Sequence, residues 1–356
     1  MERSTDVIIV GGGLSGLALA DHLEQAGIAY LILEARDRLG GRIKVGEYND
    51  SFVDLGPSWF WPGQYRIADA VKRFGLKQFN QYAAGTLSFE DQNGEVHRNM
   101  GYASMEGSYR VKGGMTSVIK AYAGALDETK IITDAPVKTA RLTNGVEVVL
   151  ENGTVVKGQK LVLAIPPRVA SNIVYEPALS VPEIQALQAI PTWMGGQAKF
   201  VAVYDEPFWR KEGLSGDAMS RHGPMVEIHD ASDMQTETGA LFGFVGVPVH
   251  VRKGHNEDVA QAALQQLGRL FGEKALKPAK VFYQDWAEEP ETSSEMDANP
   301  LGGHPSYGLP YALSNLWDGR LMLGSTETAS QFGGFIEGAL ERAEQLANEI
   351  VADRNV

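Results

Sequence analysis

The sequence predicts an α/β protein with a Rossmann-like first domain and a second, discontinuous domain of the α+β class. Three observations support this prediction. Residues 7–34 read as a strand, a glycine-rich turn, a helix and a second strand, which is the order of a βαβ unit. The chain has 356 residues, enough for two domains. A second region at 168–290 carries its own strand and helix patterns.

The first turn of the βαβ unit carries the pattern G-x-G-x-x-G, at Gly11, Gly13 and Gly16. The first glycine permits a tight turn, the second lets the backbone approach a pyrophosphate, and the third lets helix and strand pack closely. The helix expected from about Leu14 would present its free N–H groups to the phosphates. A tight turn without a ligand is the alternative interpretation of these glycines.

The rest of the unit strengthens the prediction of a dinucleotide site. The helix at 14–26 is expected to stop at Gly27, which suits a C-terminal cap. The second strand, at 30–33, is followed by Glu34, whose carboxylate can accept hydrogen bonds from ribose hydroxyls. The glycine pattern alone would be weak evidence, but strand, helix, second strand and acid are all in place.

Composition excludes several classes of function. The 45 acidic residues outnumber the 32 Lys and Arg, and this net charge of −13 argues against nucleic acid or anionic lipid as a partner. The chain has no cysteine, so disulfides, thiolate nucleophiles and a thioether to a cofactor are excluded. We expect no metal site. We also expect no membrane span, because no apolar stretch of about 18 or more uncharged residues appears. The apolar run at 7–10 is too short for a signal peptide, so a cytoplasmic location is expected.

The segment after the βαβ unit resembles a known family. Residues 34–42, Glu-Ala-Arg-Asp-Arg-Leu-Gly-Gly-Arg, are similar to the stretch that follows the dinucleotide motif in flavin-containing amine oxidases of the monoamine oxidase type. Further similar segments follow in family order and span almost the whole chain, at 54–67, 113–115, 161–167, 198–209 and 325–340. The chain is identified as a short member, because only residues 57–112 stand where well-known members carry a large helical insertion that forms much of the substrate cap.

The resemblance implies a domain organisation and a cofactor. A Rossmann-like FAD-binding domain of the glutathione-reductase-like type would comprise 1–56, 112–168 and 291–356, and the substrate domain 57–111 and 169–290. The residues implied in FAD binding are Gly11, Gly13, Leu14, Ser15, Gly16, Glu34, Ala35, Arg36, Gly41, Arg42, Gly56, Pro57, Ser58, Trp59, Val137, Ser325, Thr326, Glu327 and Ile336.

The resemblance also implies a reaction. An amine would transfer a hydride from its α-carbon to flavin N5, the imine would hydrolyse, and oxygen would reoxidise the flavin to give hydrogen peroxide. The FAD is expected to be non-covalent, with a histidyl link through His304 as the alternative. Two other functions stay open: a related FAD-dependent desaturase, isomerase or non-amine oxidase, and a flavin-holding scaffold without turnover. The partners would be a small amine and oxygen, and the sequence names neither the amine nor the oligomeric state.

Lys199 is an unusual residue in the strand expected at 197–204. Side chains alternate along a strand, so Lys199 shares a face with Val201 and Val203. One interpretation is a solvated strand face past which the ammonium extends to water. The resemblance implies another, in which the lysine holds a water beside the flavin and desolvation lowers the lysine pKa.

Aromatic residues are expected around the amine. The resemblance matches Phe335 to one of two rings that flank the substrate in many amine oxidases, and the other position falls on Pro305. Trp286 or Tyr307 would then have to supply the second ring. A core residue at a helix start is the alternative for Phe335. Paired acids at 288–289, and at 341 and 344, read as solvated surface.

Overall fold

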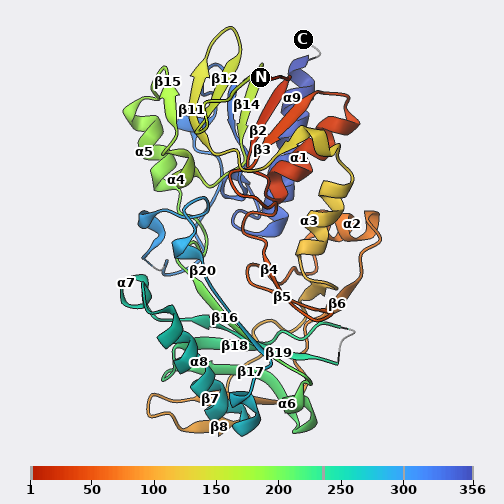
Figure 1. Ribbon diagram of the computed structural model, residues 1–356, viewed down its shortest axis with the longest axis vertical. Coiled ribbons are helices and arrows are strands. Elements are labelled where there is room, and N and C mark those ends of the chain that lie inside the picture. The colour runs from red at the N-terminus through yellow and green to blue at the C-terminus, as the bar shows by residue number, and fades with distance from the viewer. Residues whose placement is uncertain (1–2, 235–236, 300, 355–356) are drawn as a thin grey trace.

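The computed structural model describes residues 3–234, 237–299 and 301–354. The molecule is elongated, and its first and last described elements, β1 (Arg3–Ser4) and α9 (Ile336–Arg354), lie at the same end (Figure 1). Two five-stranded sheets occupy this end, and a seven-stranded sheet occupies the other. The predicted α/β class with a second α+β region is therefore observed.

The Rossmann-like half is built on a parallel sheet in the order β10-β3-β2-β14-β21. All its strand pairs are parallel, and the central strands are buried on both faces, as such sheets require. The strand bounds are β2 (Val7–Val10), β3 (Tyr30–Leu33), β10 (Ile131–Ile132), β14 (Lys160–Leu163) and β21 (Leu321–Leu323).

Helices cover one face of this sheet. The predicted first helix is α1 (Leu14–Gln25), and the left-handed Gly27, with φ +64°, ends it as expected. It packs beside α9, the helix predicted at the C-terminus, and both contribute apolar residues to one core. The same core includes residues of α2 (Tyr65–Arg73) and α3 (Thr116–Gly124).

The second five-stranded sheet covers the other face of the parallel sheet. Its order is β1-β13-β12-β11-β15, and the hairpins expected at 144–145 and 152–153 join its antiparallel strands. The bounds of its elements and of the adjoining helices are β11 (Val137–Leu142), β12 (Val146–Leu150), β13 (Val155–Gly158), β15 (Val174–Glu176), α4 (Pro167–Ala170) and α5 (Val181–Ala189).

The seven-stranded sheet runs in the order β20-β16-β19-β18-β17-β7-β8. Helix α8 (Asn256–Phe271), close to the helix predicted at 258–270, packs against one face of it. The strand bounds are β7 (Thr86–Glu90), β8 (Val96–Arg98), β16 (Ala198–Tyr204), β17 (Leu214–Ser220), β18 (Met225–Asp230), β19 (Gly239–Val245) and β20 (Lys280–Asp285). Two short helices adjoin it, α6 (Phe208–Lys211) and α7 (Val249–Arg252).

Strand β16 is buried along its whole length, and this overturns the solvated-face interpretation of Lys199. Even-numbered residues of the strand pack in the core beneath α8. On the opposite face, Val201 and Val203 pack with Val53 and Phe242, and Lys199 beside them is only 2% exposed. The ammonium must therefore find its partners inside the protein.

Two antiparallel strand pairs lie between the half with the parallel sheet and the half with the seven-stranded sheet. The chain passes from one half to the other several times. The two pairs are β4 (Val45–Tyr48) with β5 (Ser51–Asp54), and β6 (Gln78–Asn80) with β9 (Tyr109–Val111). We propose that the third crossing lies after α5 and not at the expected 168, because β15 pairs with β11 and the seven-stranded sheet resumes only at β16.

The packing of α1 against the glycine turn gives a first prediction. A Cβ on Gly16 would lie 2.0 Å from the Gly11 carbonyl oxygen, so Gly16→Ala must displace the turn. We expect a loss of about 1–3 kcal/mol in the free energy of unfolding. Gly124→Ala in α3 is the matched control, since its Cβ meets nothing within 4 Å, and it should stabilise slightly. Equal melting temperatures for the two variants would contradict this account.

Candidate active site

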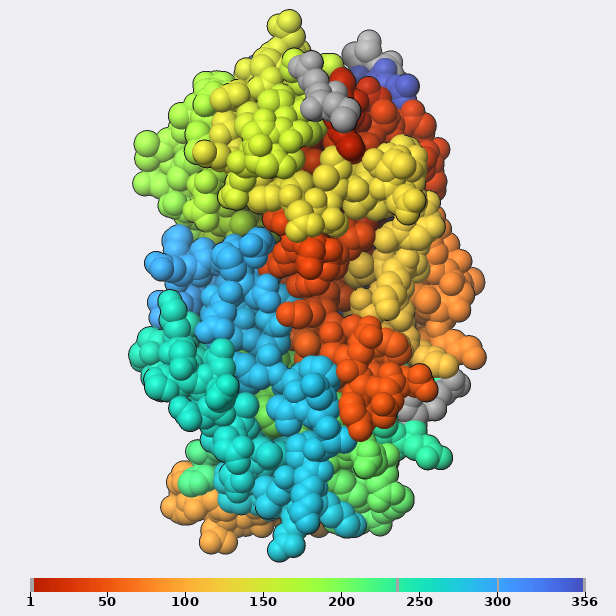
Figure 2. Space-filling model, in the orientation of Figure 1, coloured from red at the N-terminus to blue at the C-terminus, as the bar shows by residue number. Residues whose placement is uncertain are grey.

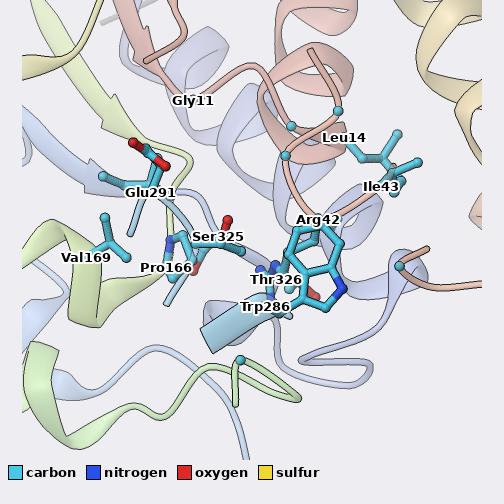
Figure 3. A pocket seen from close by; sticks show the side chains of 18 of the residues that line it. Gly11, Leu14, Arg42, Ile43, Pro166, Val169, Trp286, Glu291, Ser325 and Thr326 are labelled. Atoms are coloured by element: carbon cyan, nitrogen blue, oxygen red, sulfur yellow. The ribbon is translucent and has the colours of Figure 1, made fainter. Parts of the chain in front are cut away.

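A cavity of about 880 Å³ lies where the parallel strands end (Figure 3). Residues directly after β2, β3, β14 and β21 line it, which is the usual ligand position in an open parallel sheet. The seven-stranded sheet supplies part of the opposite wall. The predicted site residues that line the cavity are Gly11, Gly13, Leu14, Ser15, Glu34, Ala35, Arg36, Gly41, Arg42, Gly56, Pro57, Ser58, Trp59, Val137, Lys199, Trp286, Ser325, Thr326, Phe335 and Ile336.

The glycine turn leaves room for a ligand. Gly11 has φ +109°, and a Cβ there would lie 2.7 Å from the Ala164 oxygen, so the fold itself requires glycine. Gly13 differs, because a Cβ there would meet no protein atom closer than 4.0 Å. It precedes α1, whose N-terminus has no side-chain cap and no acidic residue in its first turn. The free N–H groups at this helix start suit a pyrophosphate.

Glu34 is held rigidly at the end of β3. Its Oε2 accepts a hydrogen bond from the Gly12 N–H at 2.7 Å, and its Oε1 accepts one from the Arg36 N–H at 3.0 Å. A carboxylate has about four acceptor positions, so two remain for ribose hydroxyls. Although the side chain is only 4% exposed, it reaches the cavity.

Gly16 and Glu327 do not line the cavity. Gly16 serves the contact between α1 and the turn. The fully buried Glu327 forms a bidentate ion pair with Arg42, whose Nη1 and Nη2 lie 2.5 and 3.1 Å from its carboxylate oxygens. Its place in the structure is therefore behind Arg42, which it fixes at the cavity wall.

The start of α9 is held by a buried acid. Glu341 is 2% exposed, and its carboxylate accepts hydrogen bonds from the backbone N–H groups of Ser330, Gln331 and Phe332. The expectation that Glu341 is solvated surface was wrong, because sequence did not show the loop folding back over it. Nearby, Thr326 Oγ1 donates to the Phe335 carbonyl at 2.7 Å, and the buried Ser325 Oγ has no hydrogen-bond partner among the described residues.

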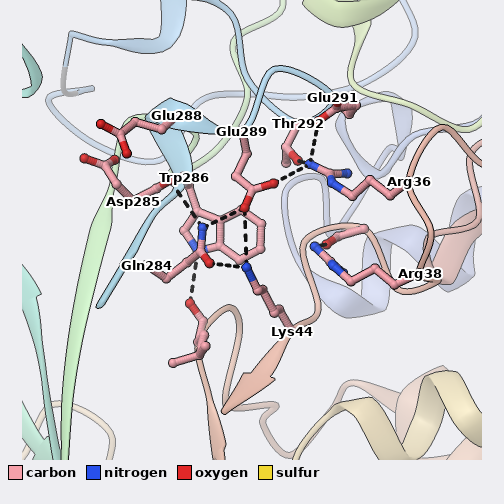
Figure 4. Close-up of polar contacts among 12 residues, drawn as sticks. Arg36, Arg38, Lys44, Gln284, Asp285, Trp286, Glu288, Glu289, Glu291 and Thr292 are labelled. Carbon is pink, nitrogen blue, oxygen red and sulfur yellow. Dashed lines mark hydrogen bonds and ion pairs between the residues drawn. The ribbon is translucent and has the colours of Figure 1, made fainter. Parts of the chain in front are cut away.

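An ion-pair network joins the segment after β3 to the segment after β20 (Figure 4). Arg36 Nη2 lies 2.8 Å from Glu289 and 2.7 Å from the Thr292 hydroxyl, and Lys44 Nζ lies 2.6 Å from Gln284. In Figure 2 the surfaces of these two segments, coloured red-orange and light blue, lie side by side in the middle of the molecule. Glu289 is thus a partner in this network, which corrects its assignment to solvated surface.

Trp286 lies at the cavity wall, held by a bond from its Nε1 to the Leu55 carbonyl at 3.0 Å. It does not form a ring pair with Phe335. Within the described residues, the rings that contact Phe335 are His304, stacked at 4.8 Å and 16°, and Trp61, edge-on at 6.3 Å. Tyr307 contacts His304 instead. Which ring faces Phe335 across the substrate therefore stays a prediction.

The Lys199 ammonium makes three hydrogen bonds. Its Nζ donates to the Asp54 carbonyl at 2.8 Å, the Gly56 carbonyl at 2.9 Å and the Ser58 hydroxyl at 2.8 Å. The Nζ also lies 4.0 Å from the Phe242 ring centre. Burial lowers the pKa of Lys199 despite the opposing effect of the Asp54 carboxylate.

Some lining residues were not expected from the sequence. Trp61 and Trp193 belong to segments without secondary-structure periodicity, and Glu227 lies on a strand that carried no motif. Residues 3–234, 237–299 and 301–354 contain no group of three or more His, Asp or Glu side chains able to hold a metal ion. In the same ranges, no helix has the length and apolar character to cross a membrane.

The site has the features of a flavoprotein dinucleotide cradle: an open glycine turn, an uncapped helix start, a carboxylate with free acceptor positions and an unpaired buried hydroxyl. The chain matches the family described as flavin containing amine oxidoreductase over residues 14–100 and 82–351, and it belongs to this family. It is an FAD-dependent oxidoreductase of the kind that oxidises amines, and FAD is its cofactor.

Relatives and solved structures resemble the chain over its full length. It is 25% identical to a probable flavin-containing monoamine oxidase A of Dictyostelium discoideum, over 98% of both chains. It is 24% identical to putrescine oxidase of Kocuria rosea, over 97% of this chain and 95% of that one. Cyclohexylamine oxidase from Brevibacterium oxydans IH-35A superposes with a TM-score of 0.84, at 20% identity, covering 99% of this chain and 100% of that chain.

The chain is a short member, as expected. Its alignment with the Dictyostelium protein runs over 454 positions, more than the 356 residues present, so part of that relative has no counterpart here. The two matches to the family overlap at residues 82–100. This overlap lies within the interval 57–112, where the reduced cap was predicted.

Glu34 gives the second prediction. Glu34→Ala removes the carboxylate proposed to accept from the ribose and releases the Gly12 and Arg36 N–H groups, so FAD should bind about 10- to 100-fold more weakly. The FAD-to-protein ratio after gel filtration measures this. Glu47→Ala, at an exposed position of β4, is the control. Equal FAD occupancy in both variants would count against the assigned role.

Proposed function

We propose that the protein is an oxidase of a small amine, with non-covalently bound FAD and oxygen as the electron acceptor. When bound, FAD takes a hydride from the amine α-carbon, and its reoxidation by oxygen gives hydrogen peroxide. The observation that carries the proposal is that one cavity joins the dinucleotide cradle to Lys199 and to the aromatic residues around Phe335. The absence of cysteine supports non-covalent binding.

The cavity favours a neutral amine next to its aromatic wall. Trp61, Trp193 and Phe335 line one part of it, and a charged ammonium would lose hydration there. A neutral amine keeps its lone pair, which assists loss of hydride from the adjacent carbon. The aromatic residues therefore position the substrate and exclude water from it.

We propose that the neutral, deprotonated form of Lys199 holds a water molecule. The charged ammonium has three N–H groups, and three protein oxygens already accept them. A neutral amine retains two N–H groups and a lone pair that can accept a hydrogen bond from water. The lowered pKa of Lys199 makes this form accessible. Such a water would be placed for imine hydrolysis or for reoxidation.

The third prediction concerns Lys199→Met. Methionine fills the space of the lysine side chain but cannot donate a hydrogen bond, so FAD should stay bound while flavin reduction or reoxidation slows by about 10-fold or more. Stopped-flow absorbance of both half-reactions measures this. Lys280→Met, at an exposed position of β20, is the control. Unchanged rates in both half-reactions would remove Lys199 from the mechanism.

The function itself is tested with a panel of amines. Purified yellow protein should bleach anaerobically with an amine of the panel, and air should restore the colour with release of peroxide. Protein that keeps its colour with every amine would favour a scaffold without turnover. Bleaching by a non-amine donor alone would favour a related oxidase or desaturase.

A further inference from the structure

Lys199 is buried among oxygens that carry no charge. Its three hydrogen-bond acceptors are the carbonyls of Asp54 and Gly56 and the hydroxyl of Ser58. An ammonium that is only 2% exposed needs a negative charge near it, or it loses its proton. The charge state of Lys199 therefore depends on groups that lie beyond its direct contacts.

Asp54 brings a carboxylate close to this ammonium. Its backbone carbonyl lies 2.8 Å from Lys199 Nζ, so covalent geometry keeps its carboxylate within about 8 Å of the Nζ. The side chain is 3% exposed, and Oδ1 accepts the Met115 N–H at 2.8 Å where α3 begins. A Cβ on Gly114, which has φ +75°, would lie 2.8 Å from Oδ1. The backbone at the start of α3 thus fixes the position of the carboxylate.

Arg110 of β9 adds a second buried cation to this group. It is 4% exposed, and its Nη1 and Nη2 donate to the carbonyls of Ser232 and Ala231 at 2.9 and 3.0 Å. The buried Oδ2 of Asp54 has no hydrogen-bond partner among the described residues. Hydrogen bonding therefore compensates the charge of this carboxylate only in part, and the carboxylate acts electrostatically on both cations.

The neighbouring strands bring no unpaired charge to Lys199. It pairs with Phe244 of β19 and with Gln284 of β20, which are both uncharged. The charged groups beyond these neighbours and beside Asp54 are Glu227 and Asp217 with His229, Lys44 with Glu289, and Asp233. The first two groups each contain acids paired with a base, so Asp54 and Arg110 are the charges that act on Lys199.

We propose that Asp54 is a positioning residue for amine oxidation, whose carboxylate, held at the start of α3, controls whether Lys199 is an ammonium or a neutral amine. This inference rests on the proposed role of neutral Lys199 in holding a water. Asp54 does not line the cavity, so it acts through the lysine. Since its own carbonyl also accepts from Nζ, one residue fixes both the place and the charge of Lys199.

The electrostatics of the group give the direction of the effect. Burial lowers the pKa of Lys199, and the Asp54 carboxylate opposes that effect. Burial raises the pKa of Asp54 to about 6, against the effects of Arg110 and Lys199. Asp54 is then mostly ionised at neutral pH, where its charge favours the ammonium form of Lys199. A neutral side chain at position 54 must shift the titration of Lys199 to lower pH.

Asp54→Asn in the FAD-loaded protein tests this inference. In protein with ¹³C-labelled lysine, the Cε resonance that Lys199→Met removes reports the titration of Lys199. We expect its midpoint to fall by about one pH unit in Asp54→Asn. The acid limb of the pH profile should move by the same amount in the flavin half-reaction that depends on Lys199.

Asp50→Asn, an exposed change of the same charge in the β4–β5 turn, is the control and should leave the midpoint where it is. The amide oxygen of Asp54→Asn can still accept the Met115 N–H, and the FAD spectrum and melting temperature check that the fold is kept. An unchanged Lys199 midpoint in Asp54→Asn would overturn the proposal, because a merely structural role lowers stability without moving this titration.

The coupling between two titrating groups is reciprocal, so Lys199→Met provides a second test. It removes the ammonium that lowers the pKa of Asp54, and the ¹³Cγ resonance of Asp54 should therefore titrate about one pH unit higher. This measurement decides the matter if Asp54→Asn fails to fold. Equal Asp54 midpoints in the wild-type protein and in Lys199→Met would contradict the proposal.

Both titrations are measured without turnover, which separates this inference from the proposed function. If no amine bleaches the flavin, amine oxidation fails, but a shifted Lys199 midpoint still supports control of its charge by Asp54. If an amine is oxidised and neither midpoint shifts, the proposed function stands and the role of Asp54 is wrong.

Discussion

Burial of one ammonium group joins the two halves of this protein. Lys199 projects from the seven-stranded sheet, and its partners, the carbonyls of Asp54 and Gly56 and the hydroxyl of Ser58, belong to the segment that leaves β5 for the cavity wall. An unpaired charge at this depth would destabilise the fold strongly. The same three bonds therefore satisfy the lysine, hold residues 54–58 at the cavity wall and fix where the seven-stranded sheet meets the dinucleotide half.

Much of the dinucleotide half could be predicted, because its determinants are local. The glycine turn, α1, β3 and Glu34 follow one another within the first 34 residues, and each has a backbone or packing reason that the sequence displays. The hairpins at 144–145 and 152–153 are equally local. Lys199 was singled out for a different reason. A charged residue in an otherwise apolar strand is costly to bury, so its presence there needs an explanation.

The features that sequence reasoning missed depend on contacts between distant segments. Glu341 and Glu289 look like surface acids on their own helix or loop, and only the fold brings backbone amides or Arg36 to them. The pairing of Glu327 with Arg42 joins residues 285 positions apart. The position of Glu227 at the cavity was missed because strand alternation assigns a side chain to a face of the sheet only when the register is known. The bulge at Val226 shifts that register by one residue.

The reduced cap changes how the substrate side of the cavity is formed. In place of a helical insertion, a short irregular segment around Ser104 and Met105 contacts the cavity, and Ser104 bonds the carboxylate of Glu227. The wall on this side of the cavity is then the seven-stranded sheet itself. Its row of Glu227, Phe244 and Lys199 is rigid because strand pairing fixes the three positions. A site built on strands holds its geometry more accurately than one built on loops. We therefore propose that selectivity in this short chain depends more on the sheet face than on a cap.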